Sequence, residues 1–229
     1  MKLLENIKHR LRHSLFLAGI WRRLMFRTKV IAITGSVGKT TCRELLVALI
    51  EQGHLDGGEV DSRHIHSTSN NENDAYGLPP VLFGIRPWHR FAVVEVSASG
   101  PGTLKRLSKA VRPDIAIVTA VAATHTKEYA NIDAIAVEKS WLIRNMRKGG
   151  QAILNGDDER VVAMRELCEM PVILYGTGAG VEISASQVQA SWPERLSFKL
   201  NSSNGQLKVQ TQLVGAHWLS SALRGLTIG

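Results

Sequence analysis

The stretch VIAITGSVGKTTCRELLVALI, residues 30–50, connects an apolar run to an amphipathic helical pattern through a glycine turn. Gly35 and Gly38 allow backbone N–H groups to point into a concave turn, and the helix that follows offers its positive N-terminus. Lys39 adds a mobile positive charge, and Thr40 supplies a hydroxyl suited to Mg²⁺. The stretch therefore predicts a cradle for the phosphates of a nucleotide. Its expected members are Gly35, Ser36, Val37, Gly38, Lys39, Thr40 and Thr41.

The match to the phosphate-binding pattern is incomplete. The full Walker sequence has a glycine five residues before the second one, and this chain has Ile33 at that position. The chain therefore matches a shorter GxxGKT variant. A plain helix start with capping threonines is the alternative. We favour the nucleotide site because a strand, two glycines, Lys-Thr-Thr and a helix occur in one register.

Short apolar runs alternate with helical patterns from residue 29 onward. Strands are expected at 30–34, 91–96, 115–121, 152–154 and 172–175, and helices around 40–52, 103–110, 132–147 and 158–169. This alternation predicts an α/β fold in which helices cover both faces of a parallel P-loop sheet. Residues 181–214 instead alternate with period two, and Asn204-Gly205 suits a tight hairpin turn. A small antiparallel β extension is therefore expected there.

Two further strand ends carry polar groups. Glu95 ends an apolar run, where a carboxylate is costly unless it is paired or binds a metal. His125 lies just past the next expected strand. A paired core glutamate and an ordinary loop histidine are the alternatives. Because ligands of an open parallel sheet bind beyond the carboxyl ends of its strands, we favour a magnesium site that joins Glu95 and His125 to Thr40.

Composition limits the class of protein. The chain has 229 residues, of which 44% are hydrophobic, so it can bury a core and is neither disordered nor fibrous. Cys42 and Cys168 lack a second pair and CxxC spacing, which argues against a disulfide framework and a structural zinc site. This pattern favours a reducing compartment, and the cytoplasm is the expected location.

Residues 1–28 form a basic arm. Segment 1–29 carries +7 of the net charge of +8, so the rest of the chain is nearly neutral. Apolar residues recur in the arm at helical spacing, at Leu3, Leu4, Ile7, Leu11, Leu15 and Ala18. The run LFLAGIW is too short to span a bilayer. We favour a helix that packs on the domain; the alternatives are peripheral contact with a membrane of anionic lipid, with nucleic acid or with a partner protein.

Several blocks of the chain carry a family resemblance. They are TGSVGKTT, NNENDAYGLPP, VVEVSASGPGTLKRLSKAVRPDIAIVTAVAATH, AIAVEKSWLI, GGQAILNGDDERV and LVGAHWLSSAL. In this order they resemble the central ATP-binding domain of the Mur ligases, over about residues 29–229. The resemblance implies an ATP-dependent ligase that joins a carboxylate to an amine, where the amine substrate is an amino acid or a dipeptide. It also implies a place in the synthesis of peptidoglycan precursors or in a related amide-forming pathway.

The same resemblance implies a chemical route and a set of residue roles. In such enzymes the γ-phosphoryl group of ATP activates a carboxylate as an acyl phosphate, which the amine then attacks. By position, Lys39 would hold the β and γ phosphates, Thr40 and Glu95 one Mg²⁺, and His125 a second. Lys139 would be a carbamylated lysine, with an ordinary helix lysine as the alternative, and Asn73 would lie near the substrate. The residues near the nucleoside would be Asn155, one of Asp157 and Asp158, and His217.

The chain also departs from the family pattern. The adenine-binding block usually reads G-x-H-N-x-x-N, and here Gly215 and His217 remain while Trp218 and Ser221 replace both asparagines. The basic arm stands where the family has a UDP-sugar domain, and the C-terminal ligase domain is expected to be absent from this chain. A nucleotide-binding or scaffold protein of weak catalytic activity is therefore the alternative function. An unrelated P-loop NTPase acting on nucleic acid ranks last, because the sheet region carries almost no net positive charge.

Overall fold

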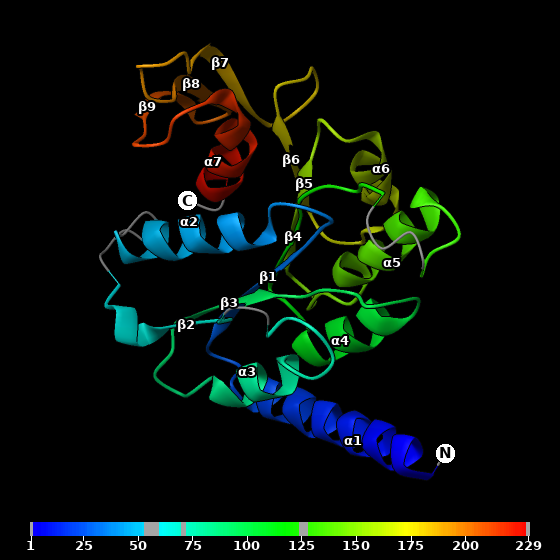
Figure 1. Cartoon of the computed structure of the whole chain (residues 1–229). Helices are drawn as coiled ribbons and strands as arrows, with labels where there is room; N and C mark the ends of the chain where they lie inside the picture. Colours follow the sequence, from blue (N-terminus) through cyan, green and yellow to red (C-terminus); the bar gives the residue numbers. More distant parts are fainter. Residues whose placement is uncertain (1, 53–59, 70–71, 124–127, 228–229) are drawn as a thin grey trace.

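The computed structural model is built on one mixed sheet, and it describes residues 2–52, 60–69, 72–123 and 128–227 (Figure 1). Within these residues the strands follow the order β2-β3-β1-β4-β5-β6-β7-β8-β9. Their bounds are β1 Lys29–Thr34, β2 Ile65–Ser67, β3 Phe91–Glu95, β4 Ile115–Val118, β5 Gln151–Asn155, β6 Val172–Gly176, β7 Ile183–Gln189, β8 Ser197–Ser202 and β9 Gly205–Gln210. Neighbours from β2 to β7 pair in parallel, and β7, β8 and β9 pair antiparallel.

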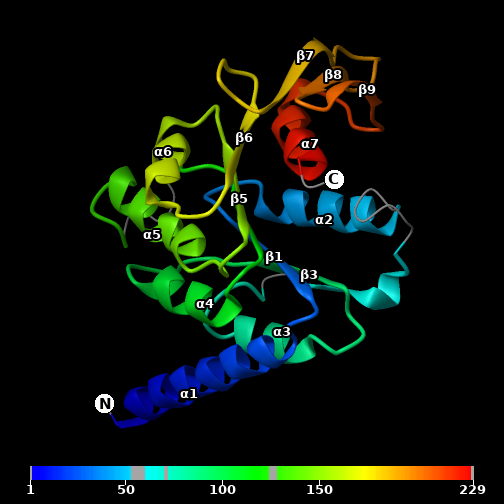
Figure 2. The same cartoon turned by 180° about the vertical axis from the view of Figure 1, so that it is seen from behind.

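Helices cover both faces of this sheet (Figures 1 and 2). Their bounds are α1 Lys2–Leu24, α2 Lys39–Glu51, α3 Leu78–Gly84, α4 Thr103–Val111, α5 Ile132–Arg144, α6 Glu159–Val162 and α7 Leu219–Leu226. Three 3₁₀ turns complete the described elements: η1 Ser62–His64, η2 Ala163–Leu167 and η3 Ala216–Trp218. The fold class predicted from the alternating pattern is therefore confirmed.

The alternating strand residues divide the core into two clusters. In β1, Val30 and Ala32 pack with α1, α3, α4, α5 and α6, whereas Ile31 and Ile33 pack with α2 and α7. All four side chains are fully buried. Burial of a valine or isoleucine side chain contributes about 1.5–3 kcal/mol, so an apolar run with no polar face is stable only with helices on both sides.

Some expected elements differ from the observed ones. β2 and α3 had no counterpart in the pattern, because β2 has three residues and α3 begins with the two prolines of LPPVLFG. Proline fits the first turn of a helix, where its missing N–H is not needed. The helix expected over 158–169 is wrong in type beyond Val162, where the chain tightens into η2.

The hairpin of the β extension is present with a shifted turn. Ser202 pairs with Gly205, so the loop consists of Ser203 and Asn204 rather than Asn204 and Gly205. Gly205 has φ +124°, a conformation that side chains disfavour. The glycine is therefore used at the first residue of β9, just after the turn.

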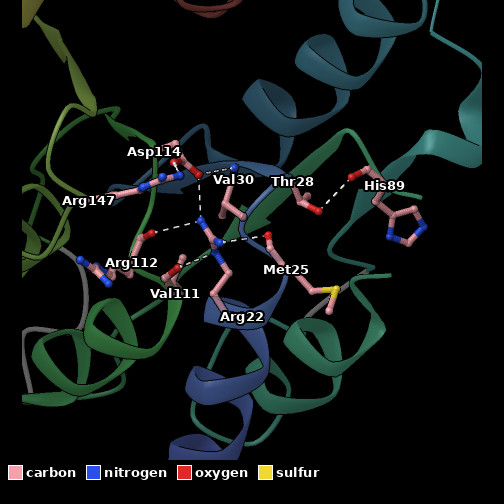
Figure 3. Close-up of polar contacts among 9 residues, drawn as sticks. All are labelled: Arg22, Met25, Thr28, Val30, His89, Val111, Arg112, Asp114 and Arg147. Atoms are coloured by element: carbon pink, nitrogen blue, oxygen red, sulfur yellow. Dashed lines mark hydrogen bonds and ion pairs between the residues drawn. The ribbon is translucent and has the colours of Figure 1, made fainter. Parts of the chain in front are cut away.

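The last turn of α1 is fixed to the sheet by a buried arginine (Figure 3). Arg22 is 4% exposed, and its Nη2 lies 2.8 Å from Oδ2 of Asp114. Its Nε donates to the carbonyl of Val111 at 3.1 Å. Asp114 also accepts from the backbone N–H of Val30 at 2.9 Å and pairs with Arg147 at 3.1 Å. One carboxylate thus connects α1 to the starts of β1, β4 and β5.

The described part of α1 packs on the domain as favoured, with two differences. Leu15 and Ala18 of the predicted stripe contact the core on the side of α3 and α4. The charge of Arg22, however, is buried rather than solvated. In addition, apolar side chains remain on the outer face, at Phe16, Leu17, Ile20 and Leu24. In the described residues no helix is long and apolar enough to cross a membrane.

Candidate functional site

The turn between β1 and α2 has the shape expected of a phosphate cradle. Gly35 has φ +151°, and a Cβ there would lie 1.8 Å from Oγ1 of Thr119, so only glycine fits. Gly38 has φ +78° and is the N-cap of α2. The first backbone N–H groups of that helix therefore follow a residue without a side chain, which leaves them accessible to an anion. The Nζ of Lys39 donates to the carbonyl of Gly35 at 2.9 Å, so the lysine folds over the turn.

The cradle is held by the end of the neighbouring strand β4. The hydroxyl of Thr119 donates to the carbonyl of Val37 at 2.6 Å. Ser36 donates its N–H to the carbonyl of Ala120 at 2.8 Å and its hydroxyl to that of Ala122 at 3.1 Å. These contacts fix the loop before any ligand arrives, which reduces the ordering cost of binding.

Thr40 and Glu95 meet across strands β1 and β3. The hydroxyl of Thr40 donates to Oε2 of Glu95 at 3.2 Å. Glu95 is 3% exposed, its N–H donates to the hydroxyl of Thr68 at 2.9 Å, and its Oε1 lies 3.1 Å from Nε of Arg43. One oxygen of the buried carboxylate therefore forms an ion pair with Arg43, and the other accepts a hydrogen bond from Thr40 at the glycine turn.

The Thr40 and Glu95 oxygens fit a magnesium ion. Two neighbouring ligands of octahedral Mg²⁺ lie about 3 Å apart, close to the observed separation, and this ion usually completes its shell with water and phosphate oxygens. Among the described residues, no group of three His, Cys, Asp or Glu side chains could hold a metal ion. The site would be one in which nucleotide and metal bind together.

Lys139 lies buried on α5 close to Lys39. It is 7% exposed, and among the described residues no acceptor is bonded to its ammonium group. Burial, followed by the positive charge of Lys39, lowers the pKa of Lys139 to about 8, although Glu138 opposes the shift. Burial also lowers the pKa of Lys39, and the carboxylate of Glu95 opposes that shift. Burial is therefore the main reason that the pKa values of both lysines are lowered.

A pocket of about 380 Å³ opens beside the turn. Gly38 and Thr41 of the cradle line it together with Asn155, His217 and Trp218. The amide of Asn155 donates to the carbonyl of Thr119 at 2.9 Å, which connects the end of β5 to that of β4. The His217 and Trp218 rings lie 5.1 Å apart and are tilted by 43°. Their flat surfaces suit a stacked ring next to the phosphate cradle.

The remaining predicted residues occupy different positions. The carbonyl of Asn73 accepts from the N–H of Ser97 at 2.7 Å, which places its segment at the end of β3. Asp157 accepts from the N–H of Thr177 at 2.8 Å, and Asp158 caps α6, so both carboxylates accept hydrogen bonds from backbone N–H groups. His125 lies outside the described residues.

Three residues of the site had not been expected from the sequence. Arg43 pairs with Glu95, Thr119 holds the cradle, and Arg224 lines the pocket. Only Arg224 had a readable signal, because His217, Ser221 and Arg224 recur at i, i+4 and i+7, the spacing of one helix face. The other two pairings are set by the strand order.

The family model and the similar proteins that comparison finds all name Mur ligases. Residues 33–229 match the family described as Mur ligase middle domain. The chain is 29% identical over 209 residues to the UDP-N-acetylmuramoyl-tripeptide–D-alanyl-D-alanine ligase of Buchnera aphidicola, covering 91% of this chain and 43% of that protein. It is 26% identical over 203 residues to the ligase of the same name from Haemophilus influenzae, covering 89% and 43%.

Solved structures agree with these relatives. The MurF structure from Acinetobacter baumannii has a TM-score of 0.82 and 27% identity, covering 93% of this chain and 45% of that one. MurF ligase from Thermotoga maritima, solved in complex with ADP, has a TM-score of 0.77 at 21% identity, covering 95% and 48%, and shows the shared fold. The chain thus spans less than half the length of these relatives. Since the family match extends over residues 33–229, the chain belongs to the Mur ligase family and contains its middle domain.

Proposed function

We propose that this chain binds ATP with Mg²⁺ and serves as the nucleotide-binding part of an ATP-dependent amide ligase. The observation that carries the proposal is the fixed glycine turn with Thr40 and Glu95 in contact beside it. The names of the relatives suggest a UDP-muramoyl peptide as the carboxylate substrate and an amino acid or dipeptide as the amine. The unpaired cysteines Cys42 and Cys168 favour the cytoplasm as the place of reaction.

The proposed chemistry needs charge neutralisation and positioning. Transfer of the γ-phosphoryl group to a carboxylate oxygen forms an acyl phosphate and ADP; attack by the amine on the acyl carbon then releases phosphate and a proton. Lys39 would turn from the Gly35 carbonyl to the β and γ phosphates. Thr40 and Glu95 would hold one Mg²⁺, which neutralises phosphate charge when bound. His125 stays a proposed ligand of a second Mg²⁺, and Asn73 a proposed substrate contact.

Lys139 is proposed to carry a carbamate. Only a neutral amine reacts with CO₂, and a pKa of about 8 leaves part of the Lys139 population neutral near pH 7. The ammonium group first loses one proton, and the neutral amine then forms an N–C bond with CO₂ and releases a second proton, so a buried cation becomes an anion. Its repulsion of Lys39 then becomes attraction, and the new carboxylate oxygens could approach a metal ion.

Asn155 and His217 are proposed to contact the nucleoside. Both line the pocket that Gly38 and Thr41 also line. The two replaced asparagines of the adenine block leave the ring of Trp218 as the larger contact surface. A weakly catalytic nucleotide-binding protein stays the alternative, since it would need the same pocket.

Calorimetry of the purified chain with ATP tests the proposal. Mg²⁺-dependent binding should weaken at least about tenfold in Lys39→Ala, because a charge-assisted contact to phosphate is lost. Glu95→Gln should chiefly reduce the Mg²⁺ dependence. Lys29→Ala is the matched control, because Lys29 is an exposed lysine at the opposite end of β1. Binding that ignores both Lys39→Ala and Mg²⁺ would refute the proposed site.

We also propose that the outer face of α1 contacts an anionic membrane surface. Phe16 and Leu24 are 64% and 60% exposed on this helix, and Phe26 just after it is 63% exposed. Arg23 and Arg27 are exposed next to them. Apolar side chains with neighbouring cations are the features of a helix that lies in the headgroup region of a bilayer. The net charge of +7 on segment 1–29 complements anionic lipid.

A further inference from the structure

Arg224 on α7 is a buried cation without an ion-pair partner in the described chain. It is 4% exposed. Its Nε donates to the carbonyl of Ser220 at 3.0 Å, and its Nη2 donates to the hydroxyl of Ser221 at 2.8 Å. Within the described residues Nη1 has no hydrogen-bond acceptor. The ring of Tyr175, 6.0 Å from the guanidinium carbon, is a weak substitute for a carboxylate.

The guanidinium of Arg224 lies against the phosphate cradle. A Cβ on Gly38 would lie 3.1 Å from both Nη1 and Nη2. Arg224 also lines the pocket together with Gly38, Thr41 and Asn155. Helices α2 and α7 pack side by side, so the fold brings Arg224 next to the start of α2 (Figures 1 and 2).

The surroundings of Arg224 are suited to an incoming anion. Burial of a guanidinium that lacks a carboxylate costs free energy, which an anion supplied by a ligand would offset. The planar guanidinium presents its N–H donors in a geometry that matches phosphate oxygens. Ser220 and Ser221 hold two donors in place, and this leaves Nη1 available on the side of Gly38.

We propose that Arg224 binds the phosphate of the nucleotide that lies nearest the nucleoside, with Nη1 as donor and Ser221 as the group that orients it. The proposal rests on the proposed nucleotide site. It assigns the phosphate nearest the nucleoside because Arg224 lies against Gly38 and also lines the pocket with Asn155 and His217, the residues proposed to contact the nucleoside. It also gives a role to Ser221, which replaces a family asparagine: the position orients a phosphate-binding arginine instead of contacting the base.

Calorimetry with ADP and adenosine tests this role. Arg224→Met should weaken ADP binding about 10- to 100-fold, and Arg224→Lys less, because lysine keeps the charge but loses the planar donor set. Ser221→Ala should weaken ADP binding by a smaller factor. Adenosine, measured by displacement of a fluorescent ADP analogue, should bind all variants within about twofold of the wild type. Arg165→Met, which removes an exposed arginine paired with Glu182, is the control.

The outcomes separate the two proposals. If Lys39→Ala abolishes ADP binding but Arg224→Met leaves it unchanged, the role of Arg224 is refuted and the nucleotide site stands. If Arg224→Met weakens adenosine as much as ADP, or Arg224→Lys lowers the melting temperature as much as Arg224→Met does, Arg224 only holds α7 in place. If the wild type binds no ADP, the nucleotide site and the role of Arg224 are both refuted.

Discussion

At the scale of single residues, Lys139 connects protonation to folding. Its pKa is about 8 in the folded chain against an ordinary value of 10.5. Below pH 8 the Lys139 amine is protonated in both the folded and the unfolded chain, and burial of its charge destabilises the folded chain to the full extent. Between pH 8 and 10.5 the unfolded state binds more protons, so this residue makes stability rise with pH.

Lys139→Met should therefore stabilise the chain at pH 7. The expected gain is on the order of 3 kcal/mol, since the pKa falls from 10.5 to about 8 and one pKa unit corresponds to about 1.4 kcal/mol. The gain should decline from pH 8 and vanish near pH 10.5, the ordinary value of the lysine. Urea unfolding of both proteins in CO₂-free buffer measures it. A difference that is constant over this range would show that Lys139 is not a destabilising buried cation.

The proposed carbamate of Lys139 has its own test. With ¹³C-labelled bicarbonate, the wild type should show a carbamate carbon signal that grows as the pH rises from 7 to about 8.5, because the neutral amine becomes more abundant. Lys139→Met should lack the signal. Lys109→Met, which removes an exposed lysine of α4, should keep it. A signal that survives in Lys139→Met would assign the modification to another amine.

At the scale of elements, the contact between α1 and the sheet depends on one ion pair. Arg22→Met should destabilise the chain by about 3 kcal/mol, because Asp114 and three backbone carbonyls lose a buried donor. Arg23→Met should cost little, since Arg23 is exposed. Guanidinium chloride unfolding compares the two variants. Equal midpoints would mean that α1 does not unfold together with the sheet.

The outer face of the same helix carries the membrane prediction. Flotation with vesicles should recover more chain as the fraction of anionic lipid rises, and added salt should reduce the recovery. The double variant Phe16→Ser, Leu24→Ser should abolish recovery, because it removes the two apolar side chains proposed to enter the bilayer. Since both side chains are exposed, their loss leaves the core intact. Val137→Ser on α5, also exposed, is the control. Binding that survives the double substitution would locate the contact elsewhere.

The elements that the sequence predicted well are those with their own periodicity. β1 and α2 could be placed because Val30–Ile50 contains a buried strand, two glycines and a helix in one continuous register. β2 could not, since three residues carry no readable period. The pairs Arg43–Glu95 and Arg22–Asp114 were also missed, because partners far apart in sequence meet only once β1 lies between β3 and β4.

The candidate site shows the same division. Residues 35–41 were predicted from local spacing, which alone defines a glycine turn before a helix. Arg224 has helical spacing with His217, but the spacing does not predict which part of the chain packs against that helix face. Its position beside Gly38 depends on α7 packing against α2, and therefore on the long connection through the β extension.

At the scale of the whole molecule, the pocket joins segments that are distant in the chain. The cradle belongs to the turn before α2, Asn155 ends β5, and Arg224 belongs to α7. A nucleotide in this pocket would therefore connect α7 to the parallel sheet. Binding energy should appear as added stability of those segments, in proportion to the logarithm of ligand concentration.

ADP with Mg²⁺ should raise the melting temperature of the chain. At about 100 times the dissociation constant the gain is about 2.7 kcal/mol, or roughly 5–10 °C for a chain of this size. Hydrogen exchange should slow at the start of α2, at Asn155 and along α7, while α1 on the opposite face stays unchanged. Arg224→Met should lose the protection of α7 but keep that of α2. Protection confined to residues 35–41 in the wild type would show that α7 takes no part in nucleotide binding, because the helix would then gain no contact with the ligand.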